Sequence, residues 1–130
     1  MKIKLLVVAK TNESYLQIGR DYYCQKLSHY FPFEYIEIPI LKQNKNLGLD
    51  QQKIKEGELI LSKIQPNDYV VLLDEHGTTM TSVGFSQYLQ QTMQKGKPIV
   101  FVIGGAYGFS NAVYERKNFI LSLSLMTFSH

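Results

Sequence analysis

Runs of apolar residues recur along this chain and alternate with stretches of helical periodicity. Ile99 to Ile103 is apolar throughout, and Ile3 to Val8 is nearly so. Such runs are typical of central parallel strands that are covered on both faces. Tyr69 to Leu73 is a third run of this kind, and it follows the turn residues Pro66 to Asp68. The pattern predicts three buried strands, the first over about Lys2 to Ala9.

The segment after Asp50 shows the periodicity of an amphipathic helix, with Asp50 as its expected cap. The stripe expected to be buried consists of Ile54, Leu61 and Ile64. Glu56 is expected to face water with its charged neighbours. Gly57 in the helix interior costs about 1 kcal/mol relative to alanine, so we expect close packing at that position.

Further elements complete the alternation of strands and helices. Helices are predicted over about 14–30, 82–95 and 110–117, and strands over 33–38 and 119–125. Ser82 is the expected cap of the third helix, and Phe85, Leu89 and Met93 are its expected core residues. The 33–38 strand alternates in polarity, which favours a place near an edge. Together these elements predict an α/β fold with a mainly parallel sheet and helices on both faces.

Size and composition narrow the classes of protein further. A chain of 130 residues that is 45% hydrophobic fits one compact domain over 1–130. No targeting or membrane-spanning segment is recognisable, so we expect a cytoplasmic protein without a membrane partner. Cys24 is the only cysteine, which excludes an internal disulfide and a cysteine-built zinc site. The formal net charge of +3 fits an anionic partner but does not by itself indicate nucleic acid.

Three predicted strands end in segments that could bind a ligand, beginning at Leu73, Gly104 and Leu123. In open α/β sheets, ligands bind at the carboxyl ends of the strands. The glycines from Gly104 to Gly108 permit positive φ and a close approach of a ligand to the main chain. On this motif alone, a tight turn in which the glycines only form the corner remains an open alternative.

Several kinds of chemistry find no support in the motifs. No GxxxxGK[ST] loop is present, which disfavours nucleoside triphosphates, and no GxSxG elbow supports a serine hydrolase. The cluster Asp74 to His76 could bind a metal or act as a base, but adjacent side chains diverge, so a loop-fixing role is the default and no metal is predicted. Ile40 to Leu49 reads as a solvated loop, with a basic arm for RNA as the alternative.

Three segments carry a family resemblance: Leu72 to Asp74, Phe101 to Gly108 and Leu121 to His130. In order and spacing they resemble the RlmH family of the SPOUT methyltransferases, and the likeness covers essentially the whole chain. The resemblance implies a homodimer with a trefoil knot near its carboxyl end. It also implies methylation of N3 of a pseudouridine in 23S ribosomal RNA, with S-adenosylmethionine as the donor. A non-catalytic RNA- or ribosome-binding module of the same fold is the alternative.

The resemblance also implies which residues bind the cofactor. It places Leu73 and Gly104 against S-adenosylmethionine, and around the adenine and methionine portions it places Leu123, Ser124, Leu125, Met126, Thr127 and Phe128. Adenine is bound by apolar contacts and main-chain hydrogen bonds, which such a segment can supply. Methyl transfer is a direct displacement that depends on alignment, and no catalytic base is assigned.

The chain departs from the family pattern at its carboxyl end. Ser129 stands where the family often has proline, and the sequence ends at His130, where family members continue into a further helix. We therefore expect a domain truncated at its carboxyl end, with an incomplete knot. The apolar segment Leu123 to Phe128 would then be left uncovered.

Overall fold

A computed structural model of the chain describes residues 3–8, 33–38, 48–104 and 108–122. Within these ranges the chain forms a five-stranded sheet, in the order β2-β1-β4-β3-β5, in which every pair of neighbours is parallel. The strands are β1 (Ile3–Val8), β2 (Phe33–Ile38), β3 (Tyr69–Thr79), β4 (Ile99–Ile103) and β5 (Phe119–Ser122). The predicted parallel sheet and the edge position of the 33–38 strand are confirmed.

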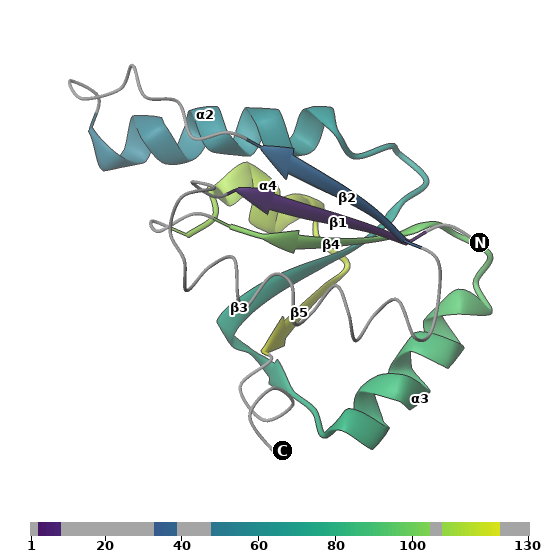
Figure 1. Cartoon of the computed structure of the whole chain (residues 1–130). Coiled ribbons are helices and arrows are strands. Elements are labelled where there is room, and N and C mark those ends of the chain that lie inside the picture. The colour runs from purple at the N-terminus through teal and green to yellow at the C-terminus, as the bar shows by residue number, and fades with distance from the viewer. Residues whose placement is uncertain (1–2, 9–32, 39–47, 105–107, 123–130) are drawn as a thin grey trace.

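Helices cover both faces of this sheet, as predicted (Figure 1). Helix α2 (Leu49–Ser62) and helix α4 (Asn111–Arg116) lie on one face, and α3 (Ser82–Met93) lies on the other. Because successive residues of a strand point to opposite faces, neighbours in β1 enter different cores. Leu6 packs in the cluster with Ile60 of α2, whereas Leu5 packs in the cluster with Leu89 of α3.

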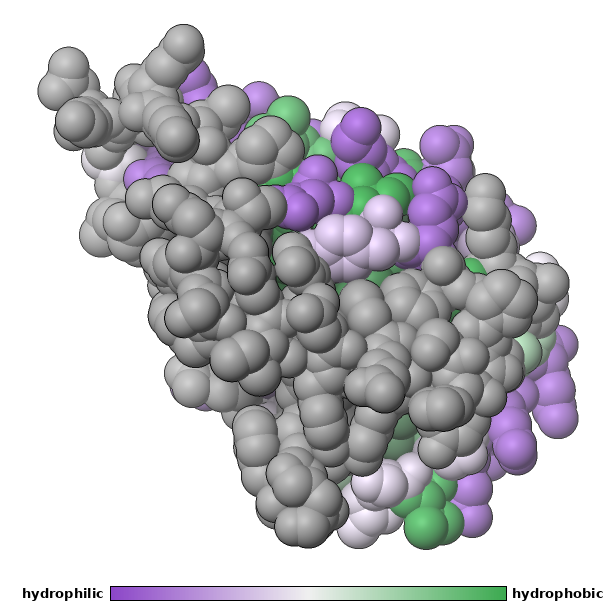
Figure 2. Space-filling view, in the orientation of Figure 1, coloured by the Kyte–Doolittle hydropathy of each residue, from purple (hydrophilic) through white to green (hydrophobic). Residues whose placement is uncertain are grey.

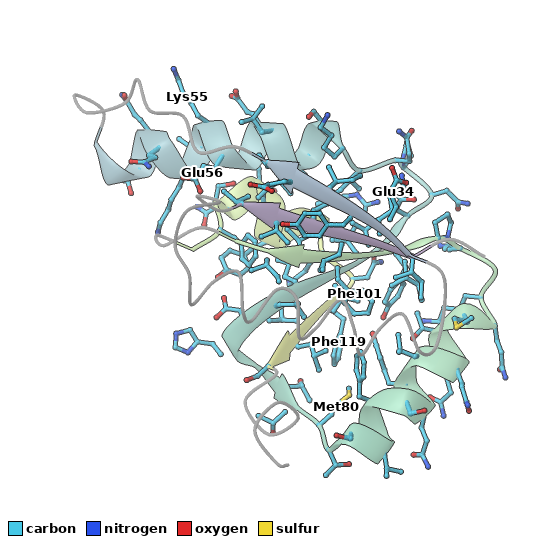
Figure 3. All side chains as sticks on the ribbon, in the orientation of Figure 1. Glu34, Lys55, Glu56, Met80, Phe101 and Phe119 are labelled. Atoms are coloured by element: carbon cyan, nitrogen blue, oxygen red, sulfur yellow. The ribbon has the colours of Figure 1, made fainter. Side chains whose placement is uncertain are left out.

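The central strand β4 is buried from Ile99 to Val102, and its last residue, Ile103, is partly accessible. Ile99, Val100 and Val102 are fully inaccessible, and Phe101 is 2% exposed. β4 pairs with β1 on one side and with β3 on the other, and both faces are covered. On the α3 side, the labelled side chains of Phe101, Phe119 and Met80 lie between the sheet and that helix (Figure 3). The prediction, from the apolar run in this segment, of a strand that is covered on both faces is confirmed.

The orientation of α2 differs from the prediction. Its N-cap is Gly48 and not Asp50, Ile54 is 52% exposed, and Glu56 is 4% exposed. The reason is a close contact with α4: a Cβ added at Gly57 would clash with the Oγ of Ser110. This contact fixes which side of α2 faces inward, so the residue next to Gly57 is buried although it is charged.

β3 is longer than predicted and contains an irregularity. The strand was expected to end at Leu73, but it continues to Thr79. Both Leu73 and Thr78 pair with Leu121 of β5, so residues 74–77 form a bulge. A Cβ added at Gly77 would lie 2.8 Å from the backbone carbonyl of residue 120, which explains why the bulge contains a glycine.

The cap of α3 also differs from the expectation. Thr81, and not Ser82, is its N-cap, with the Thr81 hydroxyl accepting a 3.0 Å hydrogen bond from the N–H of Gly84. The predicted core residues of this helix do pack against the sheet, namely Phe85, Leu89 and Met93. None of the helices that the structure describes combines the length and apolar character needed to cross a membrane.

Four sequence-based predictions lie outside the described residues. They are the helix over 14–30, the solvated loop over most of 40–49, the middle of the glycine loop at 105–107, and the carboxyl segment 123–130 with its knot. Cys24 lies in the first of these segments.

Candidate functional site

The candidate site is the edge of the sheet where β4 and β5 reach their carboxyl ends and where β3 stops pairing with β4. Leu73 of β3 is paired with Ile103 of β4 on one side and with Leu121 of β5 on the other. Gly104 directly follows Ile103, and Leu123 follows Leu121 by two positions. The structure therefore places Leu73, the last residue of β3 that pairs with β4, beside the carboxyl end of β4, which Gly104 follows. The predicted binding segment Leu123 to Phe128 lies outside the described residues.

Gly104 is packed against an aromatic ring. A Cβ added to it would lie 2.9 to 3.3 Å from the ring atoms of Phe109, which is itself 5% exposed. That spacing is shorter than ordinary van der Waals contact, so a larger residue at position 104 must displace the ring. Gly108, just before Phe109, has a φ of +83°, a conformation that favours glycine. Gly104 thus permits the close packing of Phe109, and Gly108 supplies the positive φ directly before that residue.

The β3 bulge is fixed by the carboxylate of Asp74. Its Oδ1 accepts a 3.0 Å hydrogen bond from the backbone N–H of His76, and its Oδ2 accepts a 2.6 Å hydrogen bond from the hydroxyl of Tyr114 in α4. The predicted loop-fixing role is therefore confirmed for Asp74. Within the described ranges, no group of three or more His, Cys, Asp or Glu side chains could hold a metal ion.

These hydrogen bonds shift both ionisations. Burial raises the pKa of Asp74, but the hydrogen bonds from Tyr114 and the His76 N–H and the charge of His76 outweigh it, so the pKa lies below the ordinary 3.8. The hydrogen bond to Asp74, together with burial and the negative charge of that carboxylate, raises the pKa of Tyr114 to about 12. At neutral pH the pair therefore consists of a carboxylate and a neutral phenol.

Sequence reasoning did not identify Tyr114 as part of this edge. It lies 40 residues from Asp74, in a helix of only six residues, and no spacing rule joins the two positions. Its ring also packs edge-on against Phe109, with ring centroids 5.7 Å apart. Tyr114 therefore touches both the bulge that follows Leu73 and the ring that packs on Gly104.

The arrangement suits a small organic ligand. Leu73 and Ile103 supply apolar side chains that are partly accessible, and Gly104 presents a peptide group without a side chain. Apolar walls with a few main-chain groups are typical of sites for nucleoside-like cofactors. The position at the carboxyl edge of a parallel sheet is the usual one for such ligands.

Comparison with known proteins assigns the chain to a family. A family model described as "Predicted SPOUT methyltransferase" matches residues 1–130, and the chain belongs to this family. It is 52% identical over 131 aligned residues to a protein of Christiangramia forsetii named "Ribosomal RNA large subunit methyltransferase H". Proteins of the same name from Flavobacterium johnsoniae and Parabacteroides distasonis are each 53% identical. Each alignment covers 100% of this chain and 83% of the relative.

Proposed function

We propose that this chain transfers a methyl group from S-adenosylmethionine to N3 of a pseudouridine in the ribosomal RNA of the large subunit. The observation that carries the proposal is the convergence of Leu73, Ile103 and Leu121 at one sheet edge in a chain of the SPOUT methyltransferase family. The printed names of the relatives support ribosomal RNA of the large subunit as the substrate.

The residues at this edge suit the methyl donor. S-adenosylmethionine supplies an electrophilic methyl group on a sulfonium, and the protein has to align that group with the attacking nitrogen. We assign Leu73 to an apolar wall of the cofactor site and Gly104 to a main-chain contact. The surroundings of the adenine and methionine portions are assigned to Leu123, Ser124, Leu125, Met126, Thr127 and Phe128. No residue is assigned to accept the N3 proton.

The proposal includes a homodimer that acts in the cytoplasm on the large subunit or the assembled ribosome. A site that must hold a cofactor and a large RNA together is difficult to build from one domain of 130 residues. A second copy of the chain, related by two-fold symmetry, provides additional binding surface without a longer sequence.

The test combines cofactor binding with methyl transfer. Calorimetric titration with S-adenosylmethionine should show binding, and labelled methyl groups should reach ribosomes purified from cells that lack this modification. Gly104→Ala should weaken cofactor binding by about tenfold or more, because the added Cβ displaces the ring of Phe109. The matched control is Gly48→Ala, where a Cβ meets nothing within 4 Å.

The outcomes separate the proposal from its alternative. Binding of S-adenosylmethionine with methyl transfer to N3 supports the proposal. Binding to ribosomes without any cofactor binding would instead indicate a non-catalytic module of the same fold. If Gly104→Ala and Gly48→Ala change cofactor binding equally, the assignment of Gly104 to the cofactor site is wrong.

A further inference from the structure

Basic residues gather at the sheet edge opposite the candidate site. The connection from α2 to β3 begins with Lys63, the connection from α3 to β4 contains Lys95 and Lys97, and the chain enters β5 after Arg116 and Lys117. In a parallel sheet with alternating helices, such connections all reach the amino-terminal edge. We call these five residues the amino-edge basic cluster. Figure 2 shows hydrophilic residues along the right margin, where the strands of Figure 1 begin.

Hydrogen bonds join the three connections into one surface. The N–H of Tyr69, at the start of β3, donates to the carbonyl of Pro98 at 2.8 Å. The guanidinium of Arg116 donates to the carbonyl oxygens of Gln65 and Asp68, at 2.9 and 3.0 Å. Residues from three separate parts of the sequence are thus held side by side. The cluster is therefore a defined surface and not a set of unrelated loop residues.

The four lysine side chains of this surface are exposed to solvent. The exposed side chains are those of Lys63, Lys95, Lys97 and Lys117. The amine of Lys95 lies 4.7 Å above the ring centroid of Tyr69, and the amine of Lys117 donates to the carbonyl of Tyr114. Arg116 lies in the last turn of α4 and Lys63 is the C-cap of α2, where a helix dipole favours a cation, whereas Lys95 and Lys97 lie beyond the C-cap of α3.

The charge of this edge is not balanced locally. The carboxylates in the same connections are Asp68 and Glu115, and Asp68 is 5% exposed. Within the part of the chain that the structure describes, the three connections carry five basic and two acidic residues, an excess of three positive charges. A local excess of positive charge on one surface fits a polyanionic partner.

We propose that the amino-edge basic cluster binds phosphates of the ribosomal RNA substrate at a distance from the nucleotide that is methylated. This inference rests on the proposed function. β4 has five residues, so roughly 15 Å of strand separates the cluster from the candidate site. The contacts therefore fall on RNA outside the target nucleotide. Phosphate contacts of this kind orient a protein on its substrate, while the reacting base is selected elsewhere.

The test compares two pairs of charge reversals. Lys63→Glu with Lys97→Glu alters the cluster and spares Arg116, which holds the connections together. Lys53→Glu with Lys55→Glu on α2 is the matched control, because it changes the net charge equally. Lys55 points away from the sheet in Figure 3. Affinity for ribosomes that lack the modification is measured as a function of salt, and S-adenosylmethionine binding is measured in parallel.

The variant with Lys63→Glu and Lys97→Glu should bind ribosomes about tenfold more weakly, or weaker still, at low salt. A plot of its log association constant against log salt concentration should be less steep by about 2. The control variant, with Lys53→Glu and Lys55→Glu, should change the ribosome affinity and the salt dependence much less. Binding of S-adenosylmethionine should be unchanged in both double variants. Equal weakening by the two pairs would overturn the inference, because net charge alone would then explain it. If the unmodified protein methylates ribosomes and the cluster pair binds them normally, the inference fails while the proposed function stands.

Discussion

The hydroxyl of Tyr114 donates a 2.6 Å hydrogen bond to the carboxylate of Asp74, and this contact joins α4 to the bulge of β3. Asp74 directly follows Leu73, the last residue of β3 that pairs with β4, and α4 comes after β4 in the chain. The hydrogen bond thus connects the bulge inside β3 to the helix that comes after β4. It is a contact between side chains that are only partly exposed, so it is shielded in part from water.

The strength of this contact can be measured by a double-mutant cycle. Tyr114→Phe removes the donor and should lower the free energy of unfolding by about 1 kcal/mol, as for a typical hydrogen bond. Asp74→Asn keeps a carbonyl acceptor and should cost less than Asp74→Ala. Urea unfolding of the single and double variants gives the coupling energy. Strict additivity of Tyr114→Phe and Asp74→Ala would show that the two side chains do not interact in solution.

The same pair predicts a specific pH dependence of stability. The pKa of Tyr114 is raised to about 12 from 10.0, so its contribution is complete below pH 10 and is lost as the pH rises through about 12. The pKa of Asp74 is lowered from 3.8, so its contribution is present above that value and is lost as the pH falls through the folded pKa. The difference in Tm between the protein and Tyr114→Phe should therefore be constant near neutrality and shrink at both extremes. A difference that grows in acid would contradict this assignment.

The buried carboxyl of Glu56 predicts a stabilising substitution. Burial raises its pKa above 4.5, a shift opposed by the hydrogen bond from Gln52, so the folded state disfavours the ionised form. Glu56→Gln keeps the shape and removes the charge, and it should raise Tm at pH 7. Because a raised carboxyl pKa makes the folded state bind protons more readily, this advantage should decline on acidification. Glu58→Gln, at an exposed position of the same helix, is the control and should leave Tm nearly unchanged.

The contact between α2 and α4 predicts that replacing a helical glycine by alanine lowers the free energy of unfolding, the opposite of the usual effect. In a helix interior, alanine is normally more stabilising than glycine by about 1 kcal/mol. At Gly57, however, an added Cβ clashes with Ser110 and lies 3.2 Å from Val113, which is fully buried. Gly57→Ala should therefore destabilise the protein by about 1 to 3 kcal/mol, measured by urea unfolding. A stabilised variant would show that the two helices pack less closely than the structure has them.

Much of the fold could be predicted because burial leaves a direct trace in sequence. The apolar runs of β1 and β4 had to be covered on both faces wherever their partners lay, and they predicted the parallel sheet. The alternating polarity of β2 predicted its edge position. The family likeness was readable from the segments at the strand ends, and the family model confirms it.

Other features depend on contacts between distant residues. On α2, Ile54 is exposed and Glu56 is buried, the opposite of the prediction. This follows from the packing of Gly57 on Ser110, which is more than 50 positions away in the sequence. The extension of β3 past Leu73 follows from its second pairing with β5.

The sequence by itself determined which segments are buried strands, that α2, α3 and α4 are helices, and to which family the chain belongs. The tertiary structure decided the strand order, the side of α2 that faces inward and the partnership of Tyr114 with Asp74. The physical reason is that hydrophobicity and local periodicity are properties of neighbouring residues. The phase of a helix and the partner of a carboxylate are set instead by whichever distant segment packs against them.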